Sequence, residues 1–305
     1  MLTFIIFSYN RAMQLDALLR SLFRHCEIQV HVVVLYRCTD DFKGGYELLK
    51  TRWNQVEFRE ERALSEGERR PAFPWTFANL KRFVRYKYLR QVKSDFRPLL
   101  IEVLRCAPDE YVAFLTDDSI FVEPFGLPPT VAARISAAPR EVSFSFRLGT
   151  NISLLNSYEA FDPDTIRWDY DDQSNHKDWR YYFSVDGHVY AKESLIQLCE
   201  RVLFCNPNSF EAFVFDYVRR HHWFRKGFAY RRSKLLSFPV NIVQNTQENE
   251  SLSLSLEFLE QKFLDGWHLQ YPYPGNAAAF QNYPDHVRLC KDGESDLIVK
   301  TSQET

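Results

Sequence analysis

The chain has 305 residues, of which 45% are hydrophobic and 26% charged, and this balance is typical of a globular protein with a sizeable core. Its net charge of −2 excludes the strong positive field of a nucleic-acid-binding protein, so we expect no nucleic-acid partner. Aromatic residues are abundant at 16%, which suits either a Phe-rich core or a cleft that stacks on flat ligands or sugar rings.

The cysteines and the apolar runs indicate a compartment. The six cysteines occur singly and never as CxxC, which argues against a zinc site and favours reduced thiols. The opening "MLTFIIFSYNRA" lacks the features of a signal peptide. No stretch reaches the roughly 18 apolar residues of a membrane span. We therefore expect a cytoplasmic protein without a transmembrane segment, and any membrane association to be peripheral, at the inner face.

The chain begins with a pattern of strand, helix and strand. "LTFIIF" is an apolar run that predicts a buried strand, and "HVVVLY" (31–36) predicts a second one. Between them, helical spacing relates Leu15, Leu18, Leu19 and Leu22. This order is that of a right-handed parallel α/β unit.

The next elements are helices and further strands. A basic amphipathic helix is expected over about 76–94, with Phe77 and Leu80 on one side and Arg85 on the other, basic side. A helix over 98–106 then leads into a strand over 111–115. Another strand is expected over 142–146, followed from about 150 by long polar and aromatic loops. The remaining predicted elements are a strand and helix in "FSVDGHVYAKESLIQLCERVLF", a helix in "NPNSFEAFVFDYVRRHH", a strand in "KLLSFPVNIVQ" and a helix in "SLSLEFLEQKFL".

Two adjacent carboxylates, Asp117 and Asp118, follow the apolar run 111–115. The first two strands likewise end in polar segments, "SYNR" and "RCTDD". In parallel α/β sheets, ligands bind beyond the carboxyl ends of the strands, so these three endings should line one crevice. A pair of carboxylates there suits a hard divalent cation that phosphate oxygens and water help to coordinate. The alternative is that both residues only cap the turn.

Three stretches carry a resemblance to a known family: "TFIIFSYNRAMQLDALLRSL", "FLTDDSIFV" and "NPNSFEAF". The chain resembles GT-A glycosyltransferases of the family 2-like kind, most closely over residues 1–125. The resemblance implies an α/β, Rossmann-like fold with a mostly parallel central sheet flanked by helices. It implies one domain over 1–305, with a nucleotide-sugar half at 1–125 and an irregular acceptor half at 126–291. Residues 292–305 are expected to be a polar tail that frays.

The activity implied by the resemblance is sugar transfer from a nucleotide-sugar, with a UDP-sugar favoured, to a saccharide or lipid-linked acceptor. It would depend on Mn²⁺ or Mg²⁺ and would invert the anomeric centre. Two other classes stay open: a nucleotidyltransferase, and a non-catalytic carbohydrate-binding protein that kept the fold. The first is disfavoured because "SYNRAMQL" contains no glycine for a phosphate loop.

Donor-side roles follow from the resemblance, position by position. Asp118 is the expected metal ligand, and Asp117 would face the ribose or the metal. Ser119 departs from the pattern, because many relatives have a further Asp there. Base binding is assigned only loosely, to Arg37, Asp40 or Asp41. Phe7, Ser8, Tyr9 and Arg11 are expected in the turn that lines the nucleotide. The basic side of the helix over 76–94, with Arg85, would either reach the diphosphate or form a solvated face.

Acceptor-side roles centre on three later residues. Glu211 is the expected catalytic base, although Asn208 and Glu211 also have the spacing of a helix capping box. Asp186 is the rival base. His188, in the same "VDGHVY" segment, is either a metal or phosphate ligand or a structural histidine.

Overall fold

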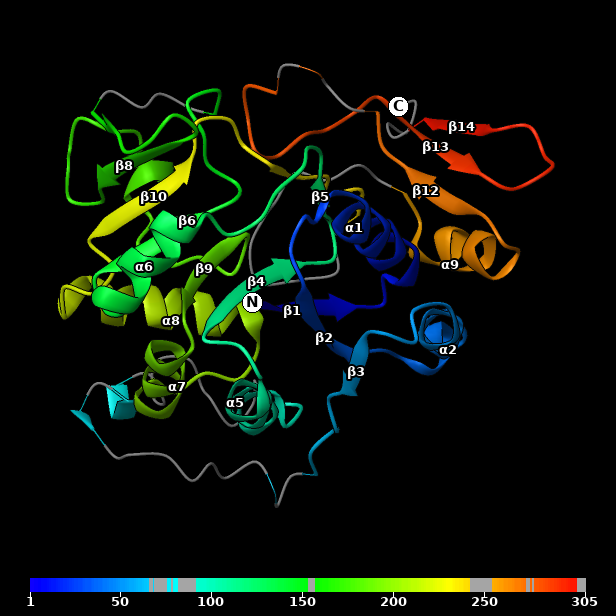
Figure 1. Ribbon diagram of the computed structural model, residues 1–305. Helices are drawn as coiled ribbons and strands as arrows, with labels where there is room; N and C mark the ends of the chain where they lie inside the picture. Colours follow the sequence, from blue (N-terminus) through cyan, green and yellow to red (C-terminus); the bar gives the residue numbers. More distant parts are fainter. Residues whose placement is uncertain are drawn as a thin grey trace.

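A nine-stranded central sheet organises the molecule, in the order β3-β2-β1-β4-β9-β6-β10-β8-β7 (Figure 1). The computed structural model describes residues 1–65, 68, 76–77, 79–81, 92–152, 157–241, 254–272, 275 and 277–300. The strands of this sheet are β1 (Leu2–Tyr9), β2 (Val30–Arg37), β3 (Glu57–Glu60), β4 (Tyr111–Thr116), β6 (Val142–Ser145), β7 (Glu159–Ala160), β8 (Thr165–Asp169), β9 (His188–Ala191) and β10 (Lys226–Tyr230).

The first part of this sheet is parallel. β1 pairs in parallel with both β2 and β4, so that Phe7 lies between Leu35 and Thr116. β2 also pairs in parallel with β3. β9 is antiparallel to both β4 and β6, and the sheet is mixed from there to β7. The carboxyl ends of β1, β2 and β4 therefore lie at one edge, as their sequence order predicts.

Helices cover both faces, which explains why β1 is apolar at successive positions rather than at alternate ones. On one face, Phe4 and Ile6 pack with α1 (Ala12–His25), α2 (Lys43–Arg52) and α9 (Leu256–Leu264). On the other, Ile5 and Phe7 pack with α5 (Phe96–Cys106), α7 (Lys192–Arg201) and α8 (Pro207–Arg220). Figure 1 shows α1, α2 and α9 grouped together, with α5 and α7 apart from them.

Smaller elements complete the described chain. A two-stranded sheet joins β5 to β11, and a three-stranded sheet has the order β12-β13-β14. The bounds of these elements are η1 (Asp40–Phe42), β5 (Ser119–Phe121), α6 (Pro129–Ala137), η3 (Lys177–Arg180), β11 (Leu235–Ser237), β12 (His268–Gln270), β13 (His286–Cys290) and β14 (Leu297–Lys300). None of the helices in the described part of the chain is long and apolar enough to cross a membrane.

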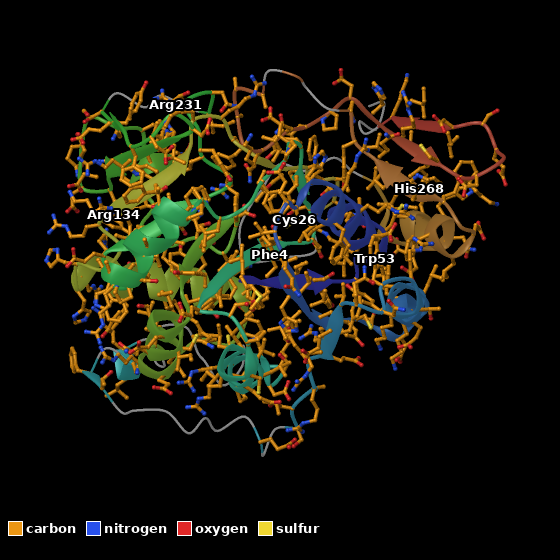
Figure 2. All side chains as sticks on the ribbon, in the orientation of Figure 1. Phe4, Cys26, Trp53, Arg134, Arg231 and His268 are labelled. Carbon is orange, nitrogen blue, oxygen red and sulfur yellow. The ribbon has the colours of Figure 1, made fainter. Side chains whose placement is uncertain are left out.

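Much of the aromatic content lies in the core. Phe4 is fully buried and lies well inside the molecule, whereas Arg134 and Arg231 lie near its edge (Figure 2). The ring of Phe4 meets the edges of Phe121 and Phe125 at centroid distances of 5.9 and 6.1 Å. The first of the two readings of the aromatic composition, a Phe-rich core, therefore holds for this part of the chain.

The α/β fold class is confirmed, and so are most of the predicted elements. Two predictions about the second half are wrong. Residues 159–160 and 165–169 are strands of the central sheet, although only loops were expected there. The expected tail contains β14, which pairs antiparallel with β13 from Leu297 to Lys300, so this part does not fray.

The predicted basic helix over 76–94 is only partly described. Phe77 and residues 79–81 are helical, but residues 78 and 82–91, including Arg85, lie outside the described residues. Phe77 and Leu80, which were expected to share one side of this helix, are 85% and 45% exposed.

Candidate active site

Asp117 is fully engaged at the edge where β1 and β4 end. Its Oδ2 accepts a hydrogen bond from the backbone N–H of Tyr9 at 3.2 Å. Its Oδ1 accepts from Arg11 Nη1 at 3.0 Å. The side chains of Arg11 and Asp117 are 9% and 5% exposed. Both oxygens of Asp117 thus tie the end of β4 to the end of β1.

Arg11 is a buried cation that bonds Asp117 and Asn241, and its contact with a nucleotide stays a prediction. Its Nε donates to Asn241 Oδ1 at 2.8 Å, and its Nη2 donates to the carbonyl oxygen of Asn241. Its Nη1 also lies 3.7 Å from Asp118 Oδ2. Asn241, which sequence reasoning missed, contributes an amide nitrogen without a hydrogen-bond partner among the described residues.

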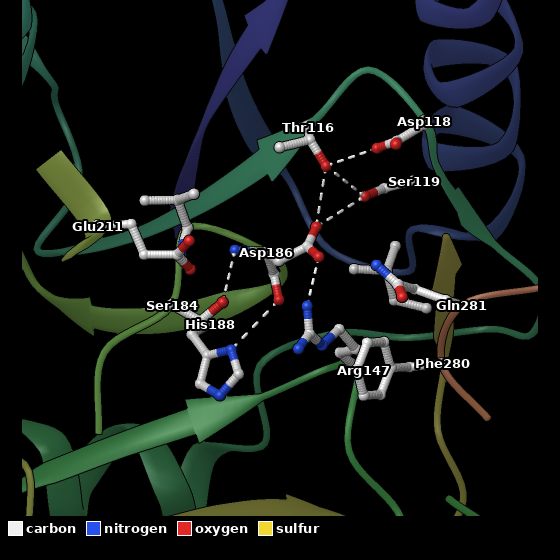
Figure 3. A network of polar contacts seen from close by, with 12 residues as sticks. Thr116, Asp118, Ser119, Arg147, Ser184, Asp186, His188, Glu211, Phe280 and Gln281 are labelled. Atoms are coloured by element: carbon white, nitrogen blue, oxygen red, sulfur yellow. Dashed lines mark hydrogen bonds and ion pairs between the residues drawn. The ribbon is translucent and has the colours of Figure 1, made fainter. Parts of the chain in front are cut away.

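Asp118 and Asp186 converge on a single hydroxyl. Thr116 Oγ1 lies 2.7 Å from Asp118 Oδ1 and 2.9 Å from Asp186 Oδ1 (Figure 3). One hydroxyl proton serves only one acceptor at a time, so the other carboxylate depends on its own partners, Arg11 for Asp118 and Arg147 for Asp186. Burial raises the pKa of Asp118 to about 6, against the opposing effect of Arg11, and Asp117 and Asp186 raise it further.

Asp186 is held by a second arginine that the sequence did not single out. Arg147, just after β6, forms an ion pair with Asp186, and its guanidinium lies over the ring of Phe280 at 3.9 Å (Figure 3). Ser119 Oγ adds a hydrogen bond to Asp186 Oδ1 at 3.2 Å. Ser119 thus supplies a donor to Asp186.

Gly187 determines the path of the chain next to Asp186. Its φ of +74° lies in the left-handed region, and an added Cβ would stand 2.3 Å from Leu235 Cδ2. Only glycine meets both conditions without strain or displacement.

Glu211 faces the site from the first turns of α8. The helix is capped by Asn206, which accepts from Ser209, so the predicted Asn208–Glu211 capping box is wrong. Glu211 Oε1 instead accepts from the backbone N–H of Val185, next to Asp186, at 3.0 Å. Burial raises the pKa of Glu211, and Asp186 raises it further. A half-buried carboxylate with a raised pKa is suited to accept a proton near neutral pH.

His188 does not join the carboxylates. Its ring is 2% exposed, and its Nδ1 lies 3.2 Å from the carbonyl oxygen of Asp186 (Figure 3). Burial, and then Arg147, lower the pKa of His188 to about 3, so the imidazole is neutral at neutral pH. In Figure 3 its ring lies on the side of Asp186 away from Asp118.

The side chains of Phe7 and Ser8 are buried, and the predicted position of these residues beside the nucleotide stays a prediction. Phe7 is 5% exposed and stacks on Phe114 at 5.5 Å in the core. Ser8 is buried, and its hydroxyl lies 2.7 Å from the hydroxyl of Tyr46. Since side chains alternate along a strand, two successive residues of β1 enter the two opposite faces of the sheet.

Tyr9 remains accessible at the end of β1. It is half-buried, and Arg37 lies over its ring with Cζ 4.9 Å from the centroid. Asp40 pairs with Lys43 in an exposed helical turn, and Asp41 is exposed. Of the three residues considered for base binding, Arg37 is the one that lies against Tyr9.

The turn after Tyr9 has a left-handed residue, Asn10, whose side chain forms hydrogen bonds with Thr39. Asn10 has a φ of +55°, which is unusual for a residue with a side chain. Its Oδ1 accepts from the backbone N–H of Thr39 at 3.0 Å, and its Nδ2 donates to Thr39 Oγ1 at 3.3 Å. These bonds hold the ends of β1 and β2 together.

The residues fit a divalent cation only in part. Carboxylate oxygens suit Mg²⁺ and Mn²⁺, and Asp118 and Asp186 place two carboxylates around Thr116 Oγ1. Among the described residues, no group of three His, Cys, Asp or Glu is placed to hold a metal. A cation here would need oxygens from a ligand, as Mg²⁺ commonly takes from substrate phosphates.

No protein-family model and no curated protein matches the chain. Solved structures of S. aureus TarS, residues 1–349, are similar at low levels. The complex with UDP-GlcNAc has a TM-score of 0.43 and 13% identity, covering 86% of this chain and 65% of that one. The complex with UDP has a TM-score of 0.42, 14% identity and coverages of 76% and 57%. A further structure has a TM-score of 0.39, 14% identity and coverages of 76% and 58%. The chain thus spans about three-fifths of the length of these TarS chains, and its chemistry has to be read from its own residues.

Proposed function

We propose that the protein is a glycosyltransferase that moves a sugar from a nucleoside-diphosphate sugar to a hydroxyl acceptor. One observation carries the proposal: the carboxylates of Asp118 and Asp186 converge on Thr116 Oγ1 at the carboxyl end of β4. This is the edge of a parallel α/β sheet at which ligands bind. The resemblance of the residues around β1 and β4 to GT-A enzymes supports the same reaction class.

The donor side uses the ends of β1 and β4. Asp118 is the protein ligand of Mn²⁺ or Mg²⁺, and the donor diphosphate supplies the further oxygens that the described residues lack. Such a cation stabilises the negative charge of the leaving diphosphate. Asp117 and Arg11 hold Asp118 in place, because the two carboxylates are adjacent and share the same guanidinium. Tyr9 and Arg37 border the nucleoside, with a UDP-sugar the first donor to test.

The acceptor side uses Glu211 as the general base. Its carboxylate takes the proton of the acceptor hydroxyl while the anomeric carbon is attacked from the side opposite the diphosphate, which inverts the configuration. Asp186 is the rival base. The ion pair with Arg147 and the bonds from Thr116 and Ser119 favour a holding role for Asp186.

Calorimetric titration with UDP, GDP and CDP, with and without Mn²⁺, tests the proposal. We expect one nucleotide to bind with a Mn²⁺-dependent affinity, and Asp118→Ala to lose that dependence, with at least about a hundredfold weaker binding. Asp292→Ala, which removes an exposed carboxylate, is the matched control and should bind like the parent. Circular dichroism should show the same fold for all three proteins.

The same titrations separate the alternatives. Parent-like, metal-dependent binding by Asp118→Ala would remove Asp118 from the site. The absence of binding by all three nucleotides would refute the transferase and favour the carbohydrate-binding alternative. A nucleotidyltransferase would release pyrophosphate from a nucleoside triphosphate, which the proposed enzyme does not.

A further inference from the structure

An aromatic stack lies against the candidate base. The rings of Tyr181 and Phe215 have centroids 4.6 Å apart and planes within 18° of parallel. Phe215 follows Glu211 by four residues on α8, so both side chains lie on the same side of the helix. Tyr181 precedes Asp186 by five residues, and the bond from Val185 N–H to Glu211 joins the two segments. The stack therefore lies between the two segments that this bond joins.

The stack differs from the core stacks in its access to solvent. Phe121 and Phe125 also stack, at 3.7 Å, but each is only 1% exposed. By contrast, Tyr181, Phe215, Glu211 and Asp186 are all half-buried, so aromatic surface and carboxylates reach solvent together. Half-exposed aromatic surface beside polar groups is typical of ligand sites.

Electrostatics place Tyr181 close to the carboxylates. Burial, and then Glu211, raise the pKa of Tyr181, with a further contribution from Asp186. The neighbouring Tyr182 is anchored differently, because its hydroxyl donates to Asp171 at 2.6 Å. Among the described residues, none forms a hydrogen bond with the Tyr181 hydroxyl.

We infer that Tyr181 and Phe215 form the acceptor subsite and that its ligand is the ring of a saccharide. The inference rests on the proposed function, whose acceptor class it specifies. A pyranose has one face of C–H groups that packs on an aromatic surface, and its hydroxyls would reach Glu211 and Asp186. A lipid chain would instead need continuous apolar surface, whereas this stack is flanked by the two carboxylates and by Arg219, whose Cζ lies 5.6 Å from the Phe215 ring.

Direct binding of sugars to the full chain tests the inference, with NMR titrations that need no knowledge of the natural acceptor. The probes are cellobiose, N,N′-diacetylchitobiose and maltose, with sorbitol as an open-chain polyol that has hydroxyls but no ring. We expect at least one disaccharide to bind, and Tyr181→Ala to weaken it about tenfold, the loss of one aromatic contact. Tyr181→Phe keeps the ring and should stay within about twofold of the parent.

Two controls keep the result interpretable. Phe258→Ala removes a 36% exposed aromatic side chain from α9 and should leave disaccharide binding unchanged. If Tyr181→Ala does not fold, Tyr181→Leu retains apolar volume but not the flat ring, and should show the same loss. The inference is wrong if none of the disaccharides binds, if sorbitol binds equally well, or if the Tyr181 variants bind like the parent.

Nucleotide titration of the same samples separates this inference from the proposed function. Mn²⁺-dependent nucleotide binding without disaccharide binding would leave the transferase standing and remove the saccharide subsite. Tyr181-dependent disaccharide binding without any nucleotide binding would remove the transferase and leave the saccharide subsite in place. Tyr181→Ala should bind nucleotide like the parent, because its side chain contacts the acceptor side alone.

Discussion

The two halves of the site are built differently. On the side of β1 and β4, Asp117 accepts a hydrogen bond from the backbone N–H of Tyr9 and pairs with the buried guanidinium of Arg11. On the other side, Asp186 lies in a turn at a left-handed glycine, and Glu211 accepts a backbone N–H from that same turn. Strand ends thus hold the proposed donor side, whereas turns and the start of a helix hold the proposed acceptor side. Changes on the first side should therefore alter binding and stability, and changes on the second should alter turnover.

The largest effect that this division predicts is on turnover at Glu211. Glu211→Gln keeps the size of the side chain but removes the basic carboxylate, so kcat should fall by roughly 10²–10⁴-fold. The donor KM should change little, since Glu211 lies on the acceptor side. Steady-state kinetics with the nucleotide-sugar identified by titration provide the measurement.

Asp186→Asn is the matched comparison for Glu211→Gln. It should lower turnover less, because Asp186 is expected to hold Arg147, Thr116 and Ser119 in place rather than to take the proton. A fully active Glu211→Gln beside an inactive Asp186→Asn would reverse the assignment of the base.

The next effect is on the free energy of unfolding, and it tests how Arg11 holds the ends of β1 and β4. Arg11→Ala leaves Asp117 buried without its cation, and breaking a buried ion pair in this way costs about 3–5 kcal/mol. Urea denaturation should show this loss. The control is Arg105→Ala, which breaks an exposed pair with Glu200 and should cost less than about 1 kcal/mol. Equal losses for the two variants would mean that the donor side is not held by Arg11.

A smaller effect is expected at Tyr9. Tyr9→Ala removes a half-buried ring at the end of β1 and leaves Arg37 without its aromatic partner. The donor KM should rise about tenfold while kcat stays within about twofold, the pattern of lost ground-state binding. Tyr9→Phe should retain most of the affinity. A fall in kcat with an unchanged KM would mean that Tyr9 does not contribute to donor binding.

The last prediction concerns the pH dependence of turnover, which the pKa of Glu211 should determine. Only the ionised form of Glu211 accepts a proton, so turnover should rise as the pH increases through the pKa of this group. Burial raises that pKa above its ordinary value of 4.5, so the ascending limb should lie above pH 4.5. In Glu211→Gln the residual activity should lack this limb. An identical limb in the variant would assign the titration to another group.

The sequence predicted the strands whose residues are buried one after another, and missed strands in which buried and exposed residues are mixed. The apolar runs of β1, β2 and β4 predict strands because both faces of the sheet are covered. β8 was missed because its inward residues, Thr165, Ile166 and Trp168, are interrupted by the exposed Arg167 within a polar segment. The helical spacing of Phe77 and Leu80 identifies a shared face but not a partner for it, and both side chains are exposed.

The site shows the same limit more sharply. Asp117 and Asp118 could be predicted because a strand end positions them locally. Arg147 and Asn241 could not, since their partners lie 39 and 230 residues away and no local pattern relates them. Arg11 was predicted at this edge of the sheet, but its burial was not, because that burial depends on Asn241.

The bond between Arg11 and Asn241 also has a consequence for how the protein is made. The ribosome synthesises Arg11 long before Asn241. The Arg11 guanidinium therefore lacks this partner while the rest of the chain is synthesised. Contacts between distant residues form late because closing a long loop is entropically costly. A nascent chain that already contains β1, β2 and β4 would hold its carboxylates only partly assembled. The active site is thus expected to be among the last parts of the protein to mature.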